Sequence, residues 1–210
     1  MITIYGIQSG NVARLRASLL QKNLPFQHVS VNLRQKSEEF KKLSAAETIP
    51  ILQDGEVIIG DSIAAMVYLD EAYPNTYKML GTTPAEKARI LSLVWAMDRI
   101  GKDVTPLYLE PMAVQLRAAG ASHRAVVYDA QQKADLQKEI DYRLEKIFAY
   151  KKGHYFREEY SAADAAMLAL LGTLLYNKLK IGKWQGWQEQ MMNEFGTIFA
   201  LQEEKGVREI

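Results

Sequence analysis

The order of secondary-structure elements is clearest in residues 48–62, which have the sequence TIPILQDGEVIIGDS. Two short runs rich in β-branched residues flank Asp54-Gly55, and this arrangement predicts a β-hairpin. A helix is predicted immediately afterwards, over residues 61–73. Before this stretch, strands are predicted at 2–5 and 26–33, and helices at 12–22 and 37–43. The first 75 residues therefore predict the order βαβαββα.

The rest of the chain predicts helices alone. A non-periodic segment, assigned as a linker over residues 76–82, is followed by Thr83-Pro84-Ala85-Glu86, which combines a capping box with proline in the first turn. The helix that starts there is expected to kink or stop near Pro106. Another helix is predicted over 134–150, and a second capping box, Ser161 to Asp164, precedes the most apolar helix. Residues 83–210 therefore predict an all-helical domain with that last helix at its centre.

Composition excludes several classes of protein. The 210 residues include 48% apolar and 24% charged side chains, as in an ordinary globular protein of one large or two small domains. There is no cysteine, which excludes disulfides, thiolate metal sites and cysteine nucleophiles. The 26 basic and 25 acidic residues form no basic stripe, so no nucleic-acid partner is expected. With neither a signal peptide nor a membrane-spanning stretch in view, we expect a cytoplasmic protein that does not bind membranes.

Four features together resemble the glutathione transferase superfamily. They are the order of elements, Thr48-Ile49-Pro50 with the hairpin, Gly60-Asp61-Ser62, and the box from Ser161 to Asp164. The resemblance implies a thioredoxin-like α/β domain (residues 1–75) joined to an all-α helical bundle, usually in a homodimer. It leaves the activity open, because this fold hosts transferases, peroxidases, dehalogenases and non-enzymatic members.

The resemblance also implies a glutathione site on the first domain. Pro50 would follow a cis peptide bond, and the backbone of Ile49 would pair with the cysteinyl residue of glutathione. From the residues alone, a trans bond is the ordinary expectation. Asp61 would bind the γ-glutamyl ammonium group, and Ser62 would meet the γ-glutamyl carboxylate at the positive end of a helix. Either side chain could equally serve as a plain helix cap.

The segment between the first strand and the first helix is where this superfamily carries its thiol-activating residue. Tyr5 lies too early, inside the strand, which leaves Ser9 with help from Asn11. Ser9-Gly10-Asn11 resembles the Ser/Thr-x-Asn pattern of bacterial nu-like members, or a theta-like serine type. A hydroxyl, an amide and helix N–H groups would each stabilise a thiolate. The alternative is that Ser9 and Asn11 are only cap and turn residues.

Other positions depart from the family or remain open. Members often carry a basic residue before the Ile-Pro pair, but here Thr48 follows Glu47, so Arg34 or Lys36 would have to hold the glycyl carboxylate. Asp98 either reaches toward a partner subunit's ligand or pairs within its own bundle. Residues after Pro106 would form the electrophile pocket, with Tyr108 and Met112 as candidates, or simply pack a loop. The histidines His28, His123 and His154 lack metal-ligand spacing, so no metal is expected.

These features lead to one main hypothesis and two alternatives. The main hypothesis is a glutathione transferase of the detoxification type, in which glutathione is a co-substrate and its thiolate attacks a small hydrophobic electrophile or peroxide. The first alternative is a glutathione-dependent disulfide reductase or peroxidase. The second is a non-catalytic binding or scaffold protein, which the unusual Glu47-Thr48 pair would favour.

Overall fold

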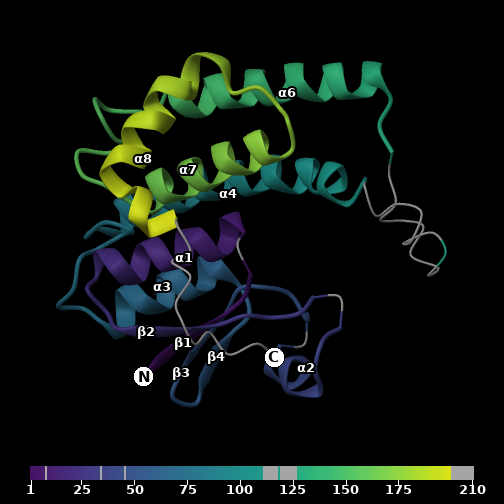
Figure 1. The fold of residues 1–210 in the computed structure, drawn as a ribbon. Helices are drawn as coiled ribbons and strands as arrows, with labels where there is room; N and C mark the ends of the chain where they lie inside the picture. Colours follow the sequence, from purple (N-terminus) through teal and green to yellow (C-terminus); the bar gives the residue numbers. More distant parts are fainter. Residues whose placement is uncertain (8, 34, 45, 111–117, 119–126, 200–210) are drawn as a thin grey trace.

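The computed structural model describes residues 1–7, 9–33, 35–44, 46–110, 118 and 127–199 (Figure 1). It confirms the predicted order βαβαββα in the first part of the chain. The strands are β1 (Ile2–Tyr5), β2 (Phe26–Val29), β3 (Ile51–Asp54) and β4 (Val57–Ile59). They form one sheet in the order β2-β1-β3-β4, in which β1 and β2 are parallel and the other pairs antiparallel.

Helices cover both faces of this sheet. They are α1 (Gly10–Gln21), α2 (Glu38–Leu43) and α3 (Ser62–Ala72). Because successive side chains of a strand point to opposite faces, Ile4 and Leu52 pack with α1 and α3, whereas Tyr5 and Ile51 pack against Phe40 of α2. Figure 1 shows α1 and α3 between the sheet and the helices of the second part. The amino-terminal end of α1 thereby lies at the boundary between the two parts.

The β3–β4 hairpin turns one residue later than the Asp-Gly pair suggests. Asp54 is still in the ladder, paired with Val57, so the two turn residues are Gly55 and Glu56. Gly55 has φ +59°, a backbone conformation that glycine adopts without steric cost. The hairpin prediction is confirmed, and its turn is shifted by the pairing of Asp54.

The second part of the chain is helical where the structure describes it. Its elements are α4 (Pro84–Leu109), α6 (Ala130–Phe148), α7 (Ala162–Tyr176), the 3-10 turn η3 (Gly182–Trp184) and α8 (Gln185–Phe199). Helix α6 begins four residues before the expected start, because Asp129 and Gln132 form a capping box that the periodicity does not reveal. Helix α7 is buried along most of its length and packs on α4 and α1, as its apolar sequence predicts.

Helix α4 ends close to Pro106, as predicted, but it includes the proline. It passes through Pro106 and ends three residues later, while the hydroxyl of Thr105 donates to the carbonyl of Gly101 at 3.0 Å. The proline removes the N–H that would otherwise donate to the carbonyl of Lys102, so one helical hydrogen bond is lost, and only three residues follow it before the helix ends. Trp95 of the same helix is 54% exposed, whereas Trp184 and Trp187 are buried, and the ammonium of Lys102 lies over the Trp95 ring.

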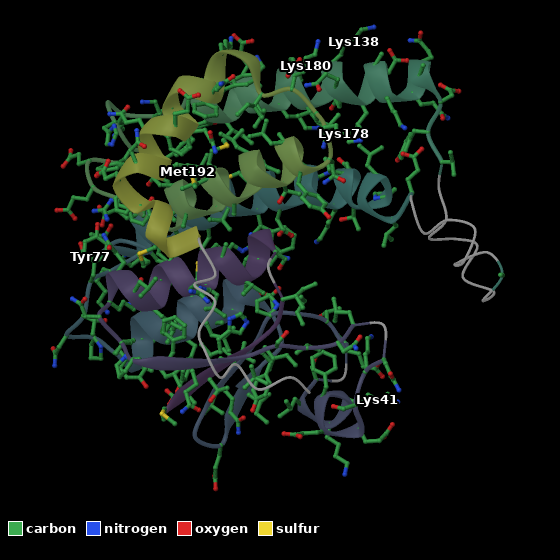
Figure 2. The ribbon with its side chains drawn as sticks, in the orientation of Figure 1. Lys41, Tyr77, Lys138, Lys178, Lys180 and Met192 are labelled. Atoms are coloured by element: carbon green, nitrogen blue, oxygen red, sulfur yellow. The ribbon has the colours of Figure 1, made fainter. Side chains whose placement is uncertain are left out.

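The lysines that follow α7 decorate the surface. Figure 2 shows Lys178 and Lys180 after this helix, with Lys138 of α6 in the same region. Lys183 pairs with Glu145 at 3.0 Å. In the part of the chain that the structure describes, no helix has both the length and the apolar character needed to cross a membrane.

A buried ion pair ties the end of α1 to the segment after α3. The Lys22 ammonium lies 2.5 Å from an Asp70 carboxylate oxygen, and both side chains are inaccessible to solvent. Asp70 also accepts from the backbone N–H groups of Met79 and Leu80, while Lys22 donates to the carbonyl of Tyr77. Burial lowers the pKa of Lys22, and the hydrogen bond that its ammonium donates to Asp70 opposes that effect. Residues 77–80 are therefore held in place between the two parts of the chain.

We predict that Lys22→Met lowers the free energy of unfolding by about 3–5 kcal/mol, because it leaves the buried Asp70 carboxylate without its counter-charge. Adding Asp70→Asn to this variant should restore part of the loss, since the amide still offers an acceptor and carries no charge. Denaturant unfolding measures both. The control Lys138→Met removes an exposed pair with Asp135 and should cost about 1 kcal/mol or less. A double variant less stable than Lys22→Met would contradict this view.

Glu86 completes the predicted capping box of α4. Its carboxylate accepts from the backbone N–H groups of Thr82 (2.9 Å) and Thr83 (3.0 Å), and the Thr83 hydroxyl accepts from the Glu86 N–H. These backbone hydrogen bonds lower the pKa of Glu86 to about 2. A carboxyl group whose pKa is depressed by folding stabilises the folded state above its unfolded pKa, and that contribution disappears as the pH falls through the folded value.

We therefore predict a pH-dependent difference between the wild type and Glu86→Gln. Between the unfolded pKa of 4.5 and about pH 2, the wild type should lose stability more steeply than the variant, whose amide keeps an acceptor but does not titrate. Thermal unfolding followed by circular dichroism at several pH values measures the two slopes. Glu145→Gln, on the exposed pair with Lys183, serves as the matched control. Parallel curves for wild type and Glu86→Gln would refute the assignment.

Candidate functional site

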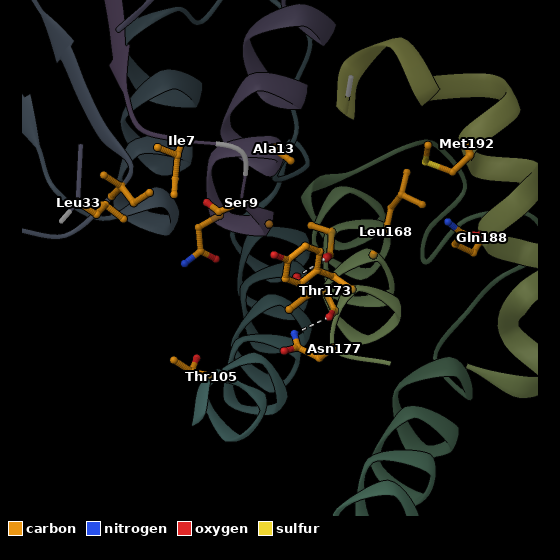
Figure 3. Close-up of a pocket in the computed structure, with 16 residues that line it drawn as sticks. Ile7, Ser9, Ala13, Leu33, Thr105, Leu168, Thr173, Asn177, Gln188 and Met192 are labelled. Carbon is orange, nitrogen blue, oxygen red and sulfur yellow. Dashed lines mark hydrogen bonds between the residues drawn. The ribbon is translucent and has the colours of Figure 1, made fainter. Parts of the chain in front are cut away.

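A cavity of about 780 Å³ lies where the sheet-containing part meets the helical part (Figure 3). Residues around the start of α1 line one side, and α4, α7 and α8 line the other. The lining residues used below are Ser9, Gly10, Asn11, Leu33, Ile49, Thr105, Leu168, Ala169, Gly172, Thr173, Tyr176, Asn177, Gln188 and Met192. Among the described lining residues, apolar side chains and neutral polar groups occur, and none is charged.

Ser9 caps α1 and also faces this cavity. Its side-chain oxygen accepts from the backbone N–H of Val12 at 3.4 Å, and its backbone is extended, as in a helix N-cap. The cap uses a lone pair, so the hydroxyl proton is still free to donate. Figure 3 shows Ser9 between Ile7 and Thr173 in the view of the cavity. The two roles left open by the sequence, cap and site residue, are compatible at Ser9.

The start of α1 offers further donors. Asn11 is exposed and lines the cavity, and the first turn of α1 contains no acidic side chain. An anion placed here would therefore meet the positive end of the helix dipole without a competing negative charge from that turn. The hydroxyl of Tyr5, in contrast, donates to the Gln53 side chain at 2.7 Å and lies within β1.

The Ile49–Pro50 peptide bond is cis, as the family resemblance implies. Ile49 precedes β3 and lines the cavity. Among the residues that the structure describes, none forms a backbone–backbone hydrogen bond with Ile49. Its main-chain N–H and C=O are therefore available to an extended peptide ligand at this edge.

Asp61 and Ser62 lie at the start of α3, and Asp61 alone caps the helix. The Asp61 carboxylate accepts from the N–H groups of Ile63 (2.9 Å) and Ala64 (2.8 Å) through one oxygen, and the side chain is exposed. Ser62 is the first residue of the helix and is only 2% exposed. The predicted cap role of Asp61 is confirmed, while Ser62 takes no part in it.

Sequence reasoning missed the partner of Ser62. Arg14 of α1 is buried, and its Nε and one terminal nitrogen donate to the Ser62 hydroxyl oxygen at 2.9 and 2.6 Å. The same terminal nitrogen lies 3.0 Å from the carboxylate of Asp98 on α4. Asp98 also pairs with Lys102 of the same helix at 3.3 Å, which is the pairing within its own bundle that the sequence left open. No local pattern signals the Arg14 contacts, because they join positions 48 and 84 residues apart.

Several sequence candidates are not among the residues that line the cavity. Pro50, Asp61 and Ser62 are described by the structure but do not belong to its lining. Arg34 and Met112 lie outside the described part of the chain, as does the side chain of Tyr108. The ammonium of Lys36 pairs with Glu47 at 3.2 Å, which neutralises the acidic residue that seemed out of place before Thr48. Over the described residues, no group of three His, Asp or Glu side chains is arranged to hold a metal ion.

The amino-terminal part of the chain is similar to a known protein family. Residues 5–77 match the family described as "Glutathione S-transferase, N-terminal domain". These residues form a glutathione S-transferase amino-terminal domain. The chain as a whole has the fold of that superfamily: a glutathione S-transferase from Rhodospirillum rubrum superposes with a TM-score of 0.75 at 19% identity, covering 99% of this chain and 96% of the other.

Sequence relatives agree over the same region. Glutathione S-transferase Z1 of Arabidopsis thaliana is 44% identical over 65 residues, covering 30% of this chain and 29% of that protein. A probable maleylacetoacetate isomerase of Vibrio cholerae is 33% identical over 112 residues, half of each chain. The matches thus span half or less of these relatives. They support the glutathione S-transferase domain. They give weaker support for any assignment of the helices that complete the cavity.

Two glycines on the cavity wall allow a test of how closely α1 and α7 pack. A Cβ on Gly10 would lie 3.0 Å from the Thr173 hydroxyl and 3.3 Å from the Ala169 carbonyl oxygen, which are hydrogen-bonded to each other. Neither neighbour is free to move away. A Cβ on Gly172, inside α7, would meet nothing within 4 Å.

We predict opposite effects of the same substitution at these two positions. Gly10→Ala should lower the free energy of unfolding by about 1 kcal/mol or more through overpacking. Gly172→Ala should raise it by up to about 1 kcal/mol, because alanine favours the helix interior. Denaturant unfolding of both variants beside the wild type measures the difference. Equal effects at the two positions would show that α1 and α7 are not in close contact.

Proposed function

We propose that this protein is a glutathione transferase that binds glutathione at the first domain and joins its sulfur to a small, uncharged hydrophobic electrophile. The observation that carries the proposal is the cavity itself. One side presents Ser9, Asn11 and the free backbone of Ile49, and the other presents Leu168 and Met192 from the helical part. A peptide thiol on the first side would therefore face an apolar substrate on the second.

The chemistry requires a thiolate, because the thiol form of glutathione is a poor nucleophile. In our proposal the Ser9 hydroxyl donates to the sulfur, and Asn11 and the first turn of α1 add further positive potential. Asp61 has one carboxylate oxygen engaged in capping, and the other would bind the γ-glutamyl ammonium. The protein contains no cysteine, so glutathione supplies the only nucleophilic sulfur in the reaction.

Substitution of Ser9 is the most direct test of this mechanism. Ser9→Ala should raise the pKa of bound glutathione thiol and lower kcat with chlorodinitrobenzene by roughly 100-fold, as for loss of one preorganised donor. The affinity for glutathione should change little, because the other contacts remain. Thiolate absorbance titration, steady-state kinetics and calorimetry measure the three quantities. Ser9→Thr keeps the hydroxyl and should retain most of the activity.

The matched control removes a helix cap elsewhere. Ser37 caps α2 by accepting from the Phe40 N–H at 3.0 Å, so Ser37→Ala loses the same type of interaction away from the cavity. Both alanine variants should lose about 0.5–2 kcal/mol of stability, and only Ser9→Ala should lose activity. Equal activity losses would show that capping alone matters. If the wild type failed to bind glutathione at millimolar concentration, a non-catalytic role would be favoured instead.

Isomerisation is a second candidate, because relatives of the first half of the chain are named as maleylacetoacetate isomerases. In such a reaction a thiolate would add to a cis double bond, permit rotation and leave again. A maleyl substrate carries a carboxylate, yet none of the described residues that line the cavity is cationic. This lining favours the uncharged electrophile. Parallel assays with maleylacetone and chlorodinitrobenzene, and a glutathione-disulfide exchange assay for reductase activity, separate the candidates.

We also propose that the active form is a homodimer. The support is the apolar surface left open on the monomer, which includes Trp95 of α4 and the edge-strand residues Val57 and Ile58. Exposed apolar residues on a helix and on a sheet edge are typical of subunit contacts. Light scattering coupled to size-exclusion chromatography gives the mass in solution, and a strictly monomeric active enzyme would contradict the proposal.

A further inference from the structure

Two threonines among the described residues that line the cavity present oxygens with their hydrogens already engaged. The Thr173 hydroxyl of α7 donates to the carbonyl of Ala169 at 2.9 Å. The Thr105 hydroxyl of α4 donates in the same way to the carbonyl of Gly101, at 3.0 Å. A threonine hydroxyl has one hydrogen and two acceptor lone pairs. Because the helix takes the hydrogen, each oxygen offers the cavity a lone pair and therefore favours a ligand that donates.

The Thr173 oxygen lies close to the start of α1. A Cβ placed on Gly10 would be 3.0 Å from it, so the absence of a side chain at Gly10 leaves that side of the oxygen uncovered. Gly10 directly follows Ser9, whose hydroxyl is the proposed donor to the glutathione sulfur. Figure 3 shows Ser9 from the first part of the chain and Thr173 on α7, with the hydrogen bonds of the helical wall dashed. An acceptor therefore lies near the place where the sulfur would react.

The surroundings of Thr173 hold it in this state. Its backbone carbonyl accepts from the backbone N–H of Asn177 at 3.2 Å and from the side-chain amide of Asn177 at 2.8 Å. Turning the Thr173 hydroxyl hydrogen toward a ligand would sacrifice its bond to Ala169, at a cost of about 1 kcal/mol. The α1 side of the cavity thus offers donors, and the α7 side offers an acceptor. A polar group of the electrophile that contacts α7 is best accommodated if it carries a hydrogen.

We propose that Thr173 is a specificity-determining residue that selects electrophiles with a hydroxyl group on the carbon next to the reacting carbon. The substrate hydroxyl donates to the Thr173 oxygen while the neighbouring carbon meets the sulfur. A γ-hydroxy enone is a simple uncharged class with this spacing, because its β-carbon is attacked and its γ-carbon carries the hydroxyl. The inference rests on the proposed function, since glutathione supplies the sulfur.

The reaction with such an enone balances without a further reactant. The thiolate sulfur forms a bond to the β-carbon, and the electron pair of the double bond moves to give an enolate on the carbonyl oxygen. The α-carbon then takes a proton from water, which replaces the proton that the thiol released on ionisation. The substrate hydroxyl keeps its hydrogen throughout, so its contact with Thr173 concerns recognition and not bond-making.

The test compares two substrates that differ in the donor hydrogen. The alcohol 5-hydroxydec-3-en-2-one and its methyl ether share the reacting double bond and the oxygen, but only the alcohol can donate. For each protein, the kcat/KM of the alcohol is divided by that of the ether, and this ratio is corrected for the uncatalysed rates with free glutathione. The corrected ratio should be roughly fivefold to tenfold in the wild type, as for one neutral hydrogen bond. Thr173→Val has nearly the same shape and should bring it to about one.

Further variants and a third substrate separate recognition from general effects. Thr173→Ser keeps the hydroxyl and should keep most of the ratio. Ser92→Ala is the matched control, because the Ser92 hydroxyl donates to the carbonyl of Ala88 at 2.8 Å on α4, outside the cavity lining. Its ratio should equal that of the wild type. Dec-3-en-2-one lacks the oxygen altogether, and the wild type should also prefer the alcohol to this parent compound. Thermal unfolding checks that each variant is folded, and the wild-type ratios need no variant.

Three results would overturn the proposal. They are a wild-type ratio near one, a ratio in folded Thr173→Val equal to that of the wild type, and no preference for the alcohol over the parent enone. Failure of the proposed function is recognised separately, because calorimetry on the wild type would then detect no glutathione binding, and both proposals would fall. A wild type that conjugates chlorodinitrobenzene but shows a ratio near one would remove the role of Thr173 and leave the proposed function intact.

Discussion

Helix α7 is apolar on every side, and a helix of this kind is stable only if other elements cover all of its faces. Eleven of its fifteen residues are buried. Helix α4 covers one side, and α1 crosses another at Gly10, where Ala169 and Thr173 leave no room for a side chain. This close approach brings the start of α1, and with it Ser9, against the middle of α7. The position of the cavity thus follows from the need to bury α7.

Buried polar groups determine how the two parts of the chain are joined around this helix. The Asp164 carboxylate at the start of α7 accepts from the N–H of Ser161 and of Phe156, both at 2.9 Å, and burial raises its pKa to about 6. The N–H of Ala162 donates to the carbonyl of Met79, whose own N–H donates to Asp70. A continuous set of hydrogen bonds therefore runs from α3 through the connecting segment to α7. Such groups are expensive to leave unpaired, so they specify one arrangement of the two parts.

Local sequence was a good guide wherever local physics controls the structure. The β3–β4 hairpin, the caps at Asp61 and Thr83, and the central apolar helix all depend on neighbouring residues, and their types were correctly predicted. The cis bond before Pro50 did not follow from the residues, which favour trans, and was correct only through family resemblance. The exposure of Trp95 could not be predicted in the same way, because periodicity identifies an apolar position without showing whether another element covers it.

In the candidate site, too, local sequence identifies the residues, whereas contacts with other parts of the fold determine their hydrogen bonds. Ser9 was identifiable from its place between a strand and a helix, but its availability as a donor depends on whether the cap uses a lone pair or the proton. Ser62 was identifiable from its place after Asp61, yet its hydrogen-bonding state is set by an arginine 48 residues away. In both serines the oxygen accepts from the protein and the proton remains. In the proposed function a thiolate must be stabilised without a cysteine of the protein, and the cap leaves the Ser9 hydroxyl able to donate because it uses only a lone pair. The same hydrogen bond therefore starts α1 and keeps the proton of the Ser9 hydroxyl on the cavity side of the helix cap.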